Sequence, residues 1–302
     1  MTRLNDGDPH PRRIVVVINP YARFARDDVE AELLRQAPPG TEIVVRGTDL
    51  SQPVSRLIGD VLPGATVVVA VGGDGTVSDV ANALAGYDIP LAIIPGGSTN
   101  MVAKVNRVPS SLRGAASLIF SRHSIERIDV GRCGEKSLVH IGGSGLDAQI
   151  FARSLPDLKR KIGWLAYVPP ALPSVRSPSS DYLITVDGRT LAVRSKLVLV
   201  ANSASLISAR FTLFPGVNRQ DGLFDVFVFT ADSGRAITRS LADILTPGRS
   251  QGPYIVHLKG RDISIGAEPA MPFELDGDIA GITPFRVIVE PAALSMICAA
   301  KP

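Results

Sequence analysis

The sequence predicts an α/β domain built on a parallel sheet, followed by a second domain that resembles an antiparallel β-sandwich. Three observations support this fold class. The first third of the chain alternates apolar runs with helical spacing, and short segments of alternating polarity replace this pattern after residue 125. The length of 302 residues is enough for two hydrophobic cores. We therefore expect a first domain at 12–128, a second at 129–290, and a closing segment at 291–302 that returns to the first domain.

Strands of the first domain are expected where β-branched and other apolar residues form unbroken runs, as in parallel strands buried on both faces. These runs lie at 14–18, 42–45, 66–71 and 91–94. Helical spacing follows each of them, at 27–36, 54–62, 77–84 and 100–121. Repeated strand–helix units of this length predict a Rossmann-like parallel sheet with right-handed crossovers.

The second domain is expected to be mainly antiparallel, because short alternating segments follow one another with turn residues between them. The expected strands are 128–132, 137–141, 182–186, 191–200, 223–229, 254–258, 263–265, 285–289 and 294–298. Asp187-Gly188 predicts a two-residue hairpin turn. Two helical insertions, at 146–172 and 234–245, and a proline- and serine-rich loop at 169–180 are expected to interrupt the strands.

Composition narrows the class of protein. The chain is 45% hydrophobic and 20% charged with a net charge of +3, which is typical of a globular protein and not of a nucleic-acid binder. Cys133 and Cys298 lie far apart and lack the spacing of a zinc site or a disulfide framework. The N-terminus lacks the apolar core of a signal peptide, and no run approaches the ~20 apolar residues of a membrane span. These features predict a cytoplasmic protein.

Three polar or glycine-rich turns follow strands of the predicted parallel sheet. Asn19-Pro20 ends the first strand, Gly72 to Thr76 ends the third and opens a helix, and Pro95 to Asn100 ends the fourth. The carboxyl ends of the strands form the edge where ligands bind in open α/β folds. Glycines also let amides at a helix N-terminus approach phosphate oxygens. The three turns together predict a nucleotide site, although each turn alone is equally typical of a tight loop without a ligand.

Competing motifs are excluded. The chain has no GxxxxGK[ST] loop, and Ser78 stands where a dinucleotide fingerprint requires its third glycine. Leu146 replaces the final glycine of a nucleophile elbow. The three turns are therefore left as the candidate phosphate site.

Several segments, in order along the chain, resemble the diacylglycerol kinase catalytic family, which includes sphingosine kinases and bacterial lipid kinases. They are Asn19-Pro20, GGDGT at 72–76, IPGGSTN at 94–100, IDVG at 128–131, IGGSGLDA at 141–148, DGLFDV at 221–226 and LDGD at 275–278. GGDGT alone is shared with NAD kinases, and the later DGLFDV and DGD segments separate the lipid kinases from them. The resemblance implies an ATP-dependent kinase that phosphorylates a hydroxyl of diacylglycerol or a related long-chain lipid, in phospholipid metabolism.

The resemblance also implies roles for single residues. ATP contacts are expected from Asn19, Pro20, Thr48, Gly72, Gly73, Asp74, Gly75, Thr76, Gly97 and Ser98. Asp278 is expected to act as the general base on the lipid hydroxyl, with Mg²⁺ bridging phosphate oxygens. Asp129 is expected to add to an acidic cluster around the metal.

A second Mg²⁺ of structural type is implied in the second domain, because the DGLFDV turn of some relatives holds one. The implied ligands are the Asp221 carboxylate and the backbone oxygens of Asn218 and Leu223. A set of ligands made only of oxygen atoms suits a hard cation.

The sequence departs from the family pattern at three places. The family base is usually glutamate, and Asp278 is one methylene shorter. Met101 stands where many relatives carry aspartate, and Arg23 and Arg26 lie near the family's phosphate-facing basic positions without clearly matching them. Two alternatives therefore stay open: an NAD kinase-like enzyme, and a lipid- or nucleotide-binding protein with impaired catalysis.

The expected partner is the lipid substrate, with no nucleic acid. The segment 153–167 joins three basic residues, 159–161, to Trp164 and Tyr167, which is typical of a contact with a membrane surface. A core-facing helix with a solvated charged end explains this segment equally well. Edge strands of the β-rich domain also offer surfaces for a homodimer.

Overall fold

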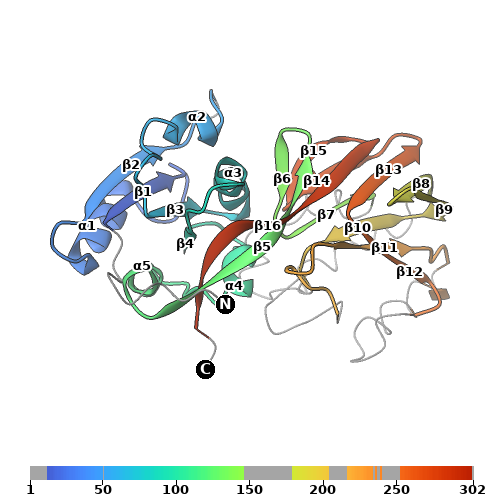
Figure 1. The fold of residues 1–302 in the computed structure, drawn as a ribbon. Coiled ribbons are helices and arrows are strands. Elements are labelled where there is room, and N and C mark those ends of the chain that lie inside the picture. The colour runs from blue at the N-terminus through green and yellow to red at the C-terminus, as the bar shows by residue number, and fades with distance from the viewer. Residues whose placement is uncertain are drawn as a thin grey trace. The chain divides into compact units, whose positions relative to one another are not determined.

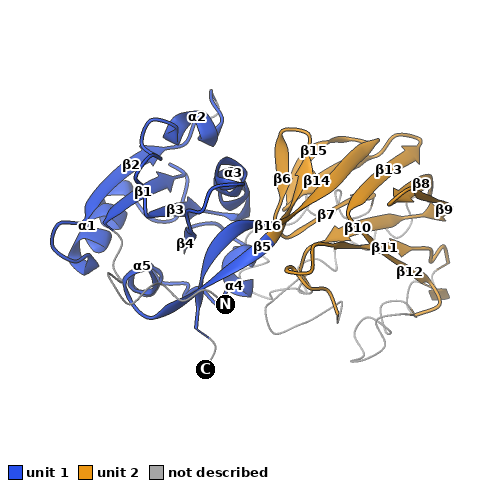
Figure 2. Ribbon diagram, viewed as in Figure 1, with its two compact units in different colours: residues 1–128, 292–302 blue, residues 129–291 orange. Residues whose placement is uncertain are grey.

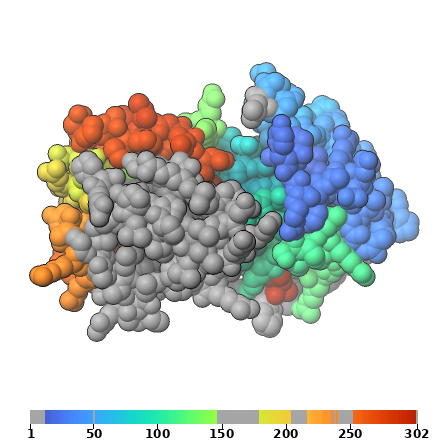
Figure 3. All heavy atoms as spheres, turned by 180° about the vertical axis from the view of Figure 1, so that it is seen from behind, coloured from blue at the N-terminus to red at the C-terminus, as the bar shows by residue number. Residues whose placement is uncertain are grey.

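The structure is a computed structural model of the chain, shown in Figure 1. It describes residues 12–49, 51–145, 179–203, 216–233, 235–236, 239 and 252–300, and the remaining residues are grey in Figure 3. The predicted insertion at 146–172 and the basic, aromatic segment at 153–167 lie outside the described residues, as do nearly all of 234–245 and most of the loop at 169–180.

The chain folds into two compact units, coloured separately in Figure 2. Unit 1 comprises Met1–Ile128 together with Ala292–Pro302, and unit 2 comprises Asp129–Pro291. The chain crosses from one unit to the other in two strands, β5 (His123–Cys133) and β16 (Phe285–Ala299). Unit 1 is therefore built from two separate stretches of sequence.

Unit 1 contains the predicted parallel sheet. Its strands are β1 (Arg13–Ile18), β2 (Glu42–Gly47), β3 (Val67–Gly72) and β4 (Leu91–Pro95), in the order β2-β1-β3-β4. The last part of β16 lies beside β4 and runs parallel to it, with Met296 opposite Leu91. β1, β3 and β4 are almost wholly buried, which explains why their sequences are unbroken apolar runs. The predicted α/β class of this domain is confirmed.

In the described part of unit 1, five helices accompany this sheet. They are α1 (Arg26–Gln36), α2 (Val54–Ile58), α3 (Asp74–Leu84), α4 (Met101–Val105) and α5 (Leu112–Phe120). α1 packs against α5 and α2 packs against α3, the pairing that right-handed crossovers give for this strand order. The helical material predicted at 100–121 is two helices, because Arg107 has a positive φ of 57° and Pro109 follows it. α3 begins at Asp74, three residues earlier than predicted and inside the glycine-rich turn.

Unit 2 is an antiparallel sandwich. One sheet contains β13 (Asp262–Glu268), β8 (Ser180–Val186), β9 (Arg189–Ser195) and the first part of β16, and β6 (Lys136–Leu138) pairs with β5. The other contains β12 (Ile255–Gly260), β11 (Phe224–Phe229), β10 (Leu197–Ala201), β7 (Ile141–Gly145), β14 (Pro272–Leu275) and β15 (Asp278–Ile282). One core joins Ile184 and Ile263 of the first sheet to Phe224 and Val226 of the second. The predicted sandwich-like class is confirmed.

Several strands of unit 2 differ from the prediction. The hairpin at Asp187-Gly188 is confirmed, with Val186 opposite Arg189. The expected strand at 191–200 is two strands, because the chain leaves one sheet after Ser195 and enters the other at Leu197. The segments 285–289 and 294–298 belong to one long strand, β16, and the strands β14 and β15 were not predicted. Within the described ranges, none of the helices has the length and apolar character needed to cross a bilayer.

Candidate active site

Three turns meet at the carboxyl edge of the parallel sheet in unit 1. Asn19, which follows β1, donates its backbone N–H to the Val71 carbonyl of β3 at 2.9 Å. Gly96, which follows β4, donates to the Gly72 carbonyl at 2.8 Å and accepts from the Arg23 N–H at 2.9 Å. The structure therefore brings together the turns at 19–20, 72–76 and 96–100, which carry nine of the ten residues predicted to contact ATP.

Two of these turns touch through backbone atoms, and the contact requires glycine. A Cβ added at Gly97 would lie 2.4 Å from the Gly73 Cα, a distance that real Cβ atoms do not reach. A Cβ added at Gly72 would lie 2.4 Å from Thr76 Oγ1. Gly97 is therefore explained by close packing of the two loops against each other, and Gly72 by close packing against Thr76 within its own loop.

The start of α3 lies within this group of turns. The N-cap is Gly73, which has no side chain to cap the helix, and the first intrahelical hydrogen bond runs from the Val77 N–H to the Gly73 carbonyl at 3.1 Å. The first amides of an α-helix have no intrahelical acceptor, and the helix dipole favours negative charge there. The start of α3 is thus suited to an anion such as a phosphate group.

The polar side chains of the turns hold the loops to one another. Asp74 Oδ1 accepts the backbone N–H of Val102 at 2.9 Å, which joins the start of α3 to the start of α4. Asn19 Nδ2 donates to Thr76 Oγ1 at 3.2 Å, and Asn19 Oδ1 accepts the Tyr21 N–H at 2.9 Å. These bonds connect all three turns, so a change in one loop is transmitted to the others.

The turn after β4 is held by Asn100, which has a left-handed φ of 51°. Its side chain accepts the Gly97 N–H at 2.9 Å and donates to the Gly97 carbonyl at 2.6 Å. Ser98, at the tip of this turn, is exposed. The amide of Gly97 is therefore already engaged, and the Ser98 hydroxyl is the better candidate for a ligand contact.

The remaining residues predicted in unit 1 lie around these turns. The Thr48 N–H donates to the Ile18 carbonyl at 2.8 Å, which places Thr48 beside the end of β1, and Pro20 is exposed. Arg23 donates to the Ser110 carbonyl at 2.7 Å and stacks on Phe24. Because this guanidinium has structural contacts, Arg23 is not a free phosphate-binding group in this arrangement.

In unit 2, Asp129 is buried and holds a turn. Its Oδ2 accepts the Gly222 N–H at 2.7 Å, and its own N–H donates to the Arg219 carbonyl at 2.8 Å. Its carbonyl accepts from Asn202 Nδ2 at 2.7 Å. These contacts fix the turn at 218–223, and the metal-supporting role of Asp129 stays a prediction.

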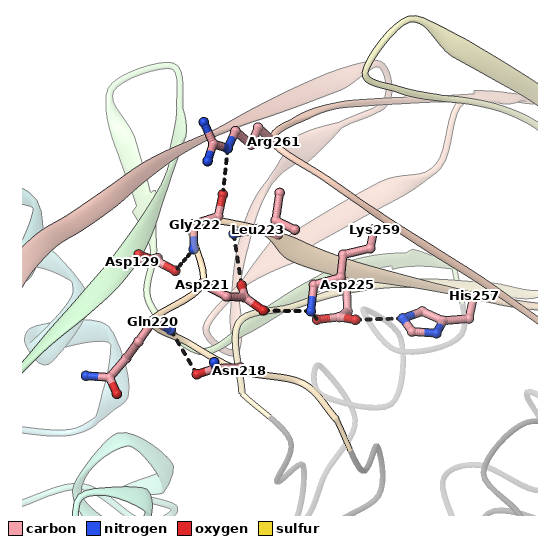
Figure 4. A network of polar contacts seen from close by, with 10 residues as sticks. All are labelled: Asp129, Asn218, Gln220, Asp221, Gly222, Leu223, Asp225, His257, Lys259 and Arg261. Carbon is pink, nitrogen blue, oxygen red and sulfur yellow. Dashed lines mark hydrogen bonds and ion pairs between the residues drawn. The ribbon is translucent and has the colours of Figure 1, made fainter.

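The turn at 218–223 is part of the polar network in Figure 4. Asp221 Oδ1 accepts the Leu223 N–H at 3.1 Å, and Asn218 Oδ1 accepts the Gln220 N–H at 3.1 Å. The Arg261 Nε donates to the Gly222 carbonyl at 3.1 Å. The turn is therefore closed by hydrogen bonds within the protein.

Lys259 of β12 neutralises the carboxylates of this network. Its Nζ lies 2.8 Å from Asp221 Oδ2 and 3.5 Å from Asp225 Oδ2, and Asp225 Oδ1 lies 2.6 Å from His257 Nε2. Partial burial lowers the pKa of Lys259, but its hydrogen bond to Asp221 and the charges of Asp225 and Asp221 outweigh burial and raise the pKa above its usual value. Lys259 is therefore a cation at neutral pH.

The structural Mg²⁺ predicted at Asp221, Asn218 and Leu223 does not fit this arrangement. One oxygen of the Asp221 carboxylate accepts a backbone amide and the other holds the ammonium group of Lys259. A dication bound to Asp221 would have to displace Lys259 or lie beside its positive charge.

Asp278, the predicted base, is the exposed first residue of β15. A two-residue turn, Asp276-Gly277, precedes it, with φ values of 52° and 97°. The buried Asp276 carboxylate accepts the backbone N–H groups of Val139, His140 and Ile141 at 2.9, 2.7 and 3.2 Å. The hairpin that carries Asp278 is therefore fixed to the segment that leads into β7.

Models of two protein families match the chain. The diacylglycerol kinase catalytic domain matches residues 13–133, and the YegS C-terminal NAD kinase beta sandwich-like domain matches residues 141–298, more than half of the chain. The chain belongs to the family of the YegS C-terminal NAD kinase beta sandwich-like domain, and its first part matches the diacylglycerol kinase catalytic domain. The match to a kinase catalytic domain indicates a kinase-type transferase.

Similar sequences come from several bacteria. A Staphylococcus haemolyticus protein with the name "putative lipid kinase" is 28% identical over 239 residues, which are 76% of this chain and 76% of that protein. An uncharacterized protein of Synechocystis is 28% identical over 238 residues, which are 77% of this chain and 55% of the relative. The chain thus spans about half the length of the Synechocystis protein.

Solved structures show the same fold. A crystal structure titled "putative diacylglycerol kinase" from Bacillus anthracis superimposes with a TM-score of 0.76 at 23% identity, covering 98% of both chains. A second structure from this organism, titled as a diacylglycerol kinase, gives a TM-score of 0.72 at 25% identity and covers 95% of this chain and 97% of that one. The likeness extends over both units of this family member.

Sequence reasoning missed two residues that hold turns of unit 2. Asp276 lies in the LDGD segment, and Asp-Gly between two short strands is a hairpin signal that could have revealed its role. Lys259 gave no such signal, because it lies 38 residues from Asp221 and only the pairing of β11 with β12 brings them together.

Proposed function

We propose that this chain transfers the γ-phosphate of ATP to a hydroxyl of diacylglycerol or a related long-chain lipid. The observation that carries the proposal is the meeting of three turns at the carboxyl edge of the unit 1 sheet, around the uncapped start of α3. The match of residues 13–133 to the diacylglycerol kinase catalytic domain supports the same chemistry.

The turns of unit 1 would bind the triphosphate. The amides at the start of α3 offer hydrogen bonds and the positive end of the helix dipole, while Ser98 offers a hydroxyl. Asn19 and Thr76 fix the relative positions of the loops through their side-chain hydrogen bond. In phosphoryl transfer most of the catalysis comes from positioning and charge stabilisation, which is what a pre-formed loop cluster supplies.

Magnesium is the metal that this proposal requires, bound together with ATP. Mg²⁺ is commonly held by one or two carboxylates plus phosphate oxygens, so few protein ligands are needed. Asp74 supplies a carboxylate inside the phosphate-binding turn, with Oδ1 bound to the Val102 amide. The ion would neutralise charge on the phosphate oxygens.

Asp278 would accept the proton of the lipid hydroxyl. Its carboxylate is exposed, while the neighbouring Asp276 holds the hairpin through three backbone amides. An accessible base on a fixed hairpin suits general base catalysis, which requires hydrogen-bond reach to the proton that is removed.

Two apolar side chains on the same strand favour a long-chain acceptor. Ile279 is 59% exposed and Ile282 is 65% exposed, and both lie on β15 with Asp278. β15 is the last strand in the path of its sheet, so these isoleucines belong to an edge strand. Exposed isoleucines on such a strand are suited to contact with acyl chains.

The proposal is tested with radiolabelled ATP and a panel of acceptors in vesicles: diacylglycerol, sphingosine and other long-chain alcohols, with NAD as a soluble acceptor. We expect label in a lipid that depends on added Mg²⁺. NAD is included because the family model that matches residues 141–298 describes an NAD kinase beta sandwich-like domain. Label in NAD alone would favour the NAD kinase-like alternative.

Substitution of the base sharpens this assay. Asp278→Asn should lower kcat about 10²–10⁴-fold, the usual contribution of general acid–base catalysis, while Asp278→Glu restores the family residue and should keep activity. Asp181→Asn, on exposed Asp181 of β8, is the matched control and should leave kcat unchanged. A folded protein that binds Mg-ATP and labels none of the acceptors would contradict the proposal.

A further inference from the structure

The position of Lys259 is set by the backbone of unit 2. β11 and β12 pair so that Asp225 lies directly opposite Lys259. Directly opposed residues in an antiparallel pair share one face of the sheet, so their side chains meet by construction. The ammonium group of Lys259 reaches Asp225 at 3.5 Å and Asp221 at 2.8 Å.

The network needs a positive charge at this place. Asp225 is only 2% exposed, and its Oδ2 has no hydrogen-bond partner in the described part of the chain. His257 Nε2 lies 2.6 Å from the other oxygen, Oδ1, so the ammonium group of Lys259 is the charged group that faces Oδ2, and burial of a carboxylate without such a partner is costly. A second carboxylate, Asp221, lies against the same ammonium group. The ammonium group is the cation that both carboxylates share.

We propose that Lys259 is a built-in counter-ion that takes the place of a divalent cation at the 218–223 turn, so that unit 2 neither binds nor needs a metal ion there. The oxygens of Asp221 are engaged by the Leu223 amide and by Lys259. The turn is closed by the Asp129 and Arg261 contacts to Gly222. The shape of the turn therefore requires no metal ion, and a positive charge already lies against both carboxylates.

Thermal unfolding of the whole chain tests this proposal. The experiment is done without nucleotide, so that magnesium carried by ATP does not contribute. The wild-type protein is measured in EDTA, in Mg²⁺ and in Ca²⁺, and a paramagnetic titration with Mn²⁺ measures binding directly. We expect the same unfolding midpoint in all three solutions and no Mn²⁺ site that disappears in an Asp221→Asn variant.

A variant that lacks the lysine charge is expected to respond to metal ions, unlike the wild-type protein. Lys259→Met keeps an unbranched side chain and removes the ammonium group from Asp221 and Asp225, while Asp225 keeps its contact with His257. We expect a lower midpoint in EDTA and a rise of about 5 °C with Mg²⁺ or Ca²⁺, because a ligand that binds only the folded state stabilises it. The double variant with Asp221→Asn should lose this rise.

Lys136→Met is the matched control, because Lys136 is an exposed lysine on β6 of the same unit. Its unfolding should respond to no ion. A wild-type midpoint raised by Mg²⁺ or Ca²⁺ through Asp221 would overturn the proposal, and so would a Lys259→Met variant that gains no ion response.

If Lys259→Met does not fold, the wild-type and Asp221→Asn proteins decide the question alone. If neither of these two proteins responds to Mg²⁺ or Ca²⁺, the result supports the proposal that Lys259 is the counter-ion. If the wild-type protein has an ion site that Asp221→Asn lacks, the result overturns the proposal. Kinase activity enters none of these measurements, so the result does not depend on the lipid acceptor.

Discussion

In unit 1 the turns at the sheet edge touch through glycine backbones and are joined by one half-buried carboxylate, Asp74, whereas in unit 2 the turns are held by buried carboxylates. Gly73 and Gly97 lie too close to each other for any side chain at Gly97. Asp129 and Asp276, by contrast, are buried and accept backbone N–H groups of distant turns. Both arrangements fix a loop, but the glycine contacts leave backbone amides available to a ligand, whereas the buried carboxylates use backbone amides as their own partners.

The difference explains what each unit can bind. A carboxylate that fixes a turn uses the backbone amides that would otherwise face an anion, and it adds negative charge. Glycine packing adds no charge and leaves the amides at the start of α3 for a ligand. Unit 1 is therefore suited to phosphate groups, while unit 2 is suited to presenting acidic groups and the cations that balance them.

The largest effect is expected from Asp276→Ala in unit 2. This change removes the acceptor of three backbone amides at 139–141 and leaves buried donors behind. Hydrogen bonds to charged groups contribute about 1.5–3 kcal/mol each, so we expect a loss of about 3–5 kcal/mol in the free energy of unfolding, measured in urea. Asp278→Asn, at an exposed position of the same hairpin, should leave the midpoint unchanged. Equal effects of the two would show that the buried carboxylate does not hold the turn.

Gly97→Ala tests the glycine contact of unit 1. The added Cβ would lie 2.4 Å from the Gly73 Cα, so the loops must separate. Overpacking of this kind costs about 1–3 kcal/mol, and we expect ATP binding measured by calorimetry to weaken together with stability. Gly47→Ala is the control, because nothing lies within 4 Å of an added Cβ there. If Gly97→Ala binds ATP as well as Gly47→Ala does, the close packing is not what shapes the nucleotide site.

A smaller effect is expected at the isoleucines of β15. The double change Ile279→Ser and Ile282→Ser removes two exposed apolar side chains near Asp278 and should raise KM for a vesicle-borne lipid about tenfold. The kcat for a soluble short-chain acceptor should not change. Ile288→Ser, at a 43% exposed position of β16, is the control for a general loss of surface hydrophobicity. Equal KM values for both variants would remove β15 from the lipid contact.

The smallest effect is expected for an exposed carboxylate of unit 2. A hydrogen bond and the positive charge of Arg286 lower the pKa of Asp262. Any stability from this pair is present above the unfolded pKa of about 3.9 and is lost as pH falls through the lower folded pKa. Because exposed pairs contribute little, Asp262→Asn should not change the unfolding midpoint at neutral pH. If Asp262→Asn clearly lowers the unfolding midpoint at neutral pH, then burial, as at Asp276, is not what makes a carboxylate of unit 2 important for stability.

The strands of unit 1 could be predicted because strands buried on both faces are unbroken apolar runs. β7 could not be predicted in the same way, because three of its five residues are glycines. A Cβ at Gly143 would lie 2.6 Å from the Val198 carbonyl oxygen, and one at Gly142 would lie 2.8 Å from that of Glu274. Close packing inside a sheet therefore produced a sequence that is typical of a loop.

The candidate site likewise has contacts that the sequence could predict and contacts that it could not. The meeting of the three turns follows from strand order in a parallel sheet, which local patterns reveal. The contacts of Lys259 with Asp221 and of Asp276 with His140 depend on pairing between distant strands, which no local pattern encodes. The roles predicted for Asp278 and for the ATP-contacting residues stay predictions until the assays are done.

The two crossings of the chain also affect the order in which the units can be completed. The ribosome produces all of Asp129–Pro291 before it produces Leu294 to Cys298, which lie beside β4 in unit 1 and are almost fully buried. During synthesis, unit 2 therefore has its whole sequence while the sheet of unit 1 still lacks its neighbour to β4. A stop codon at Ala292 would leave unit 2 intact in sequence but expose an apolar sheet edge in unit 1, which favours aggregation.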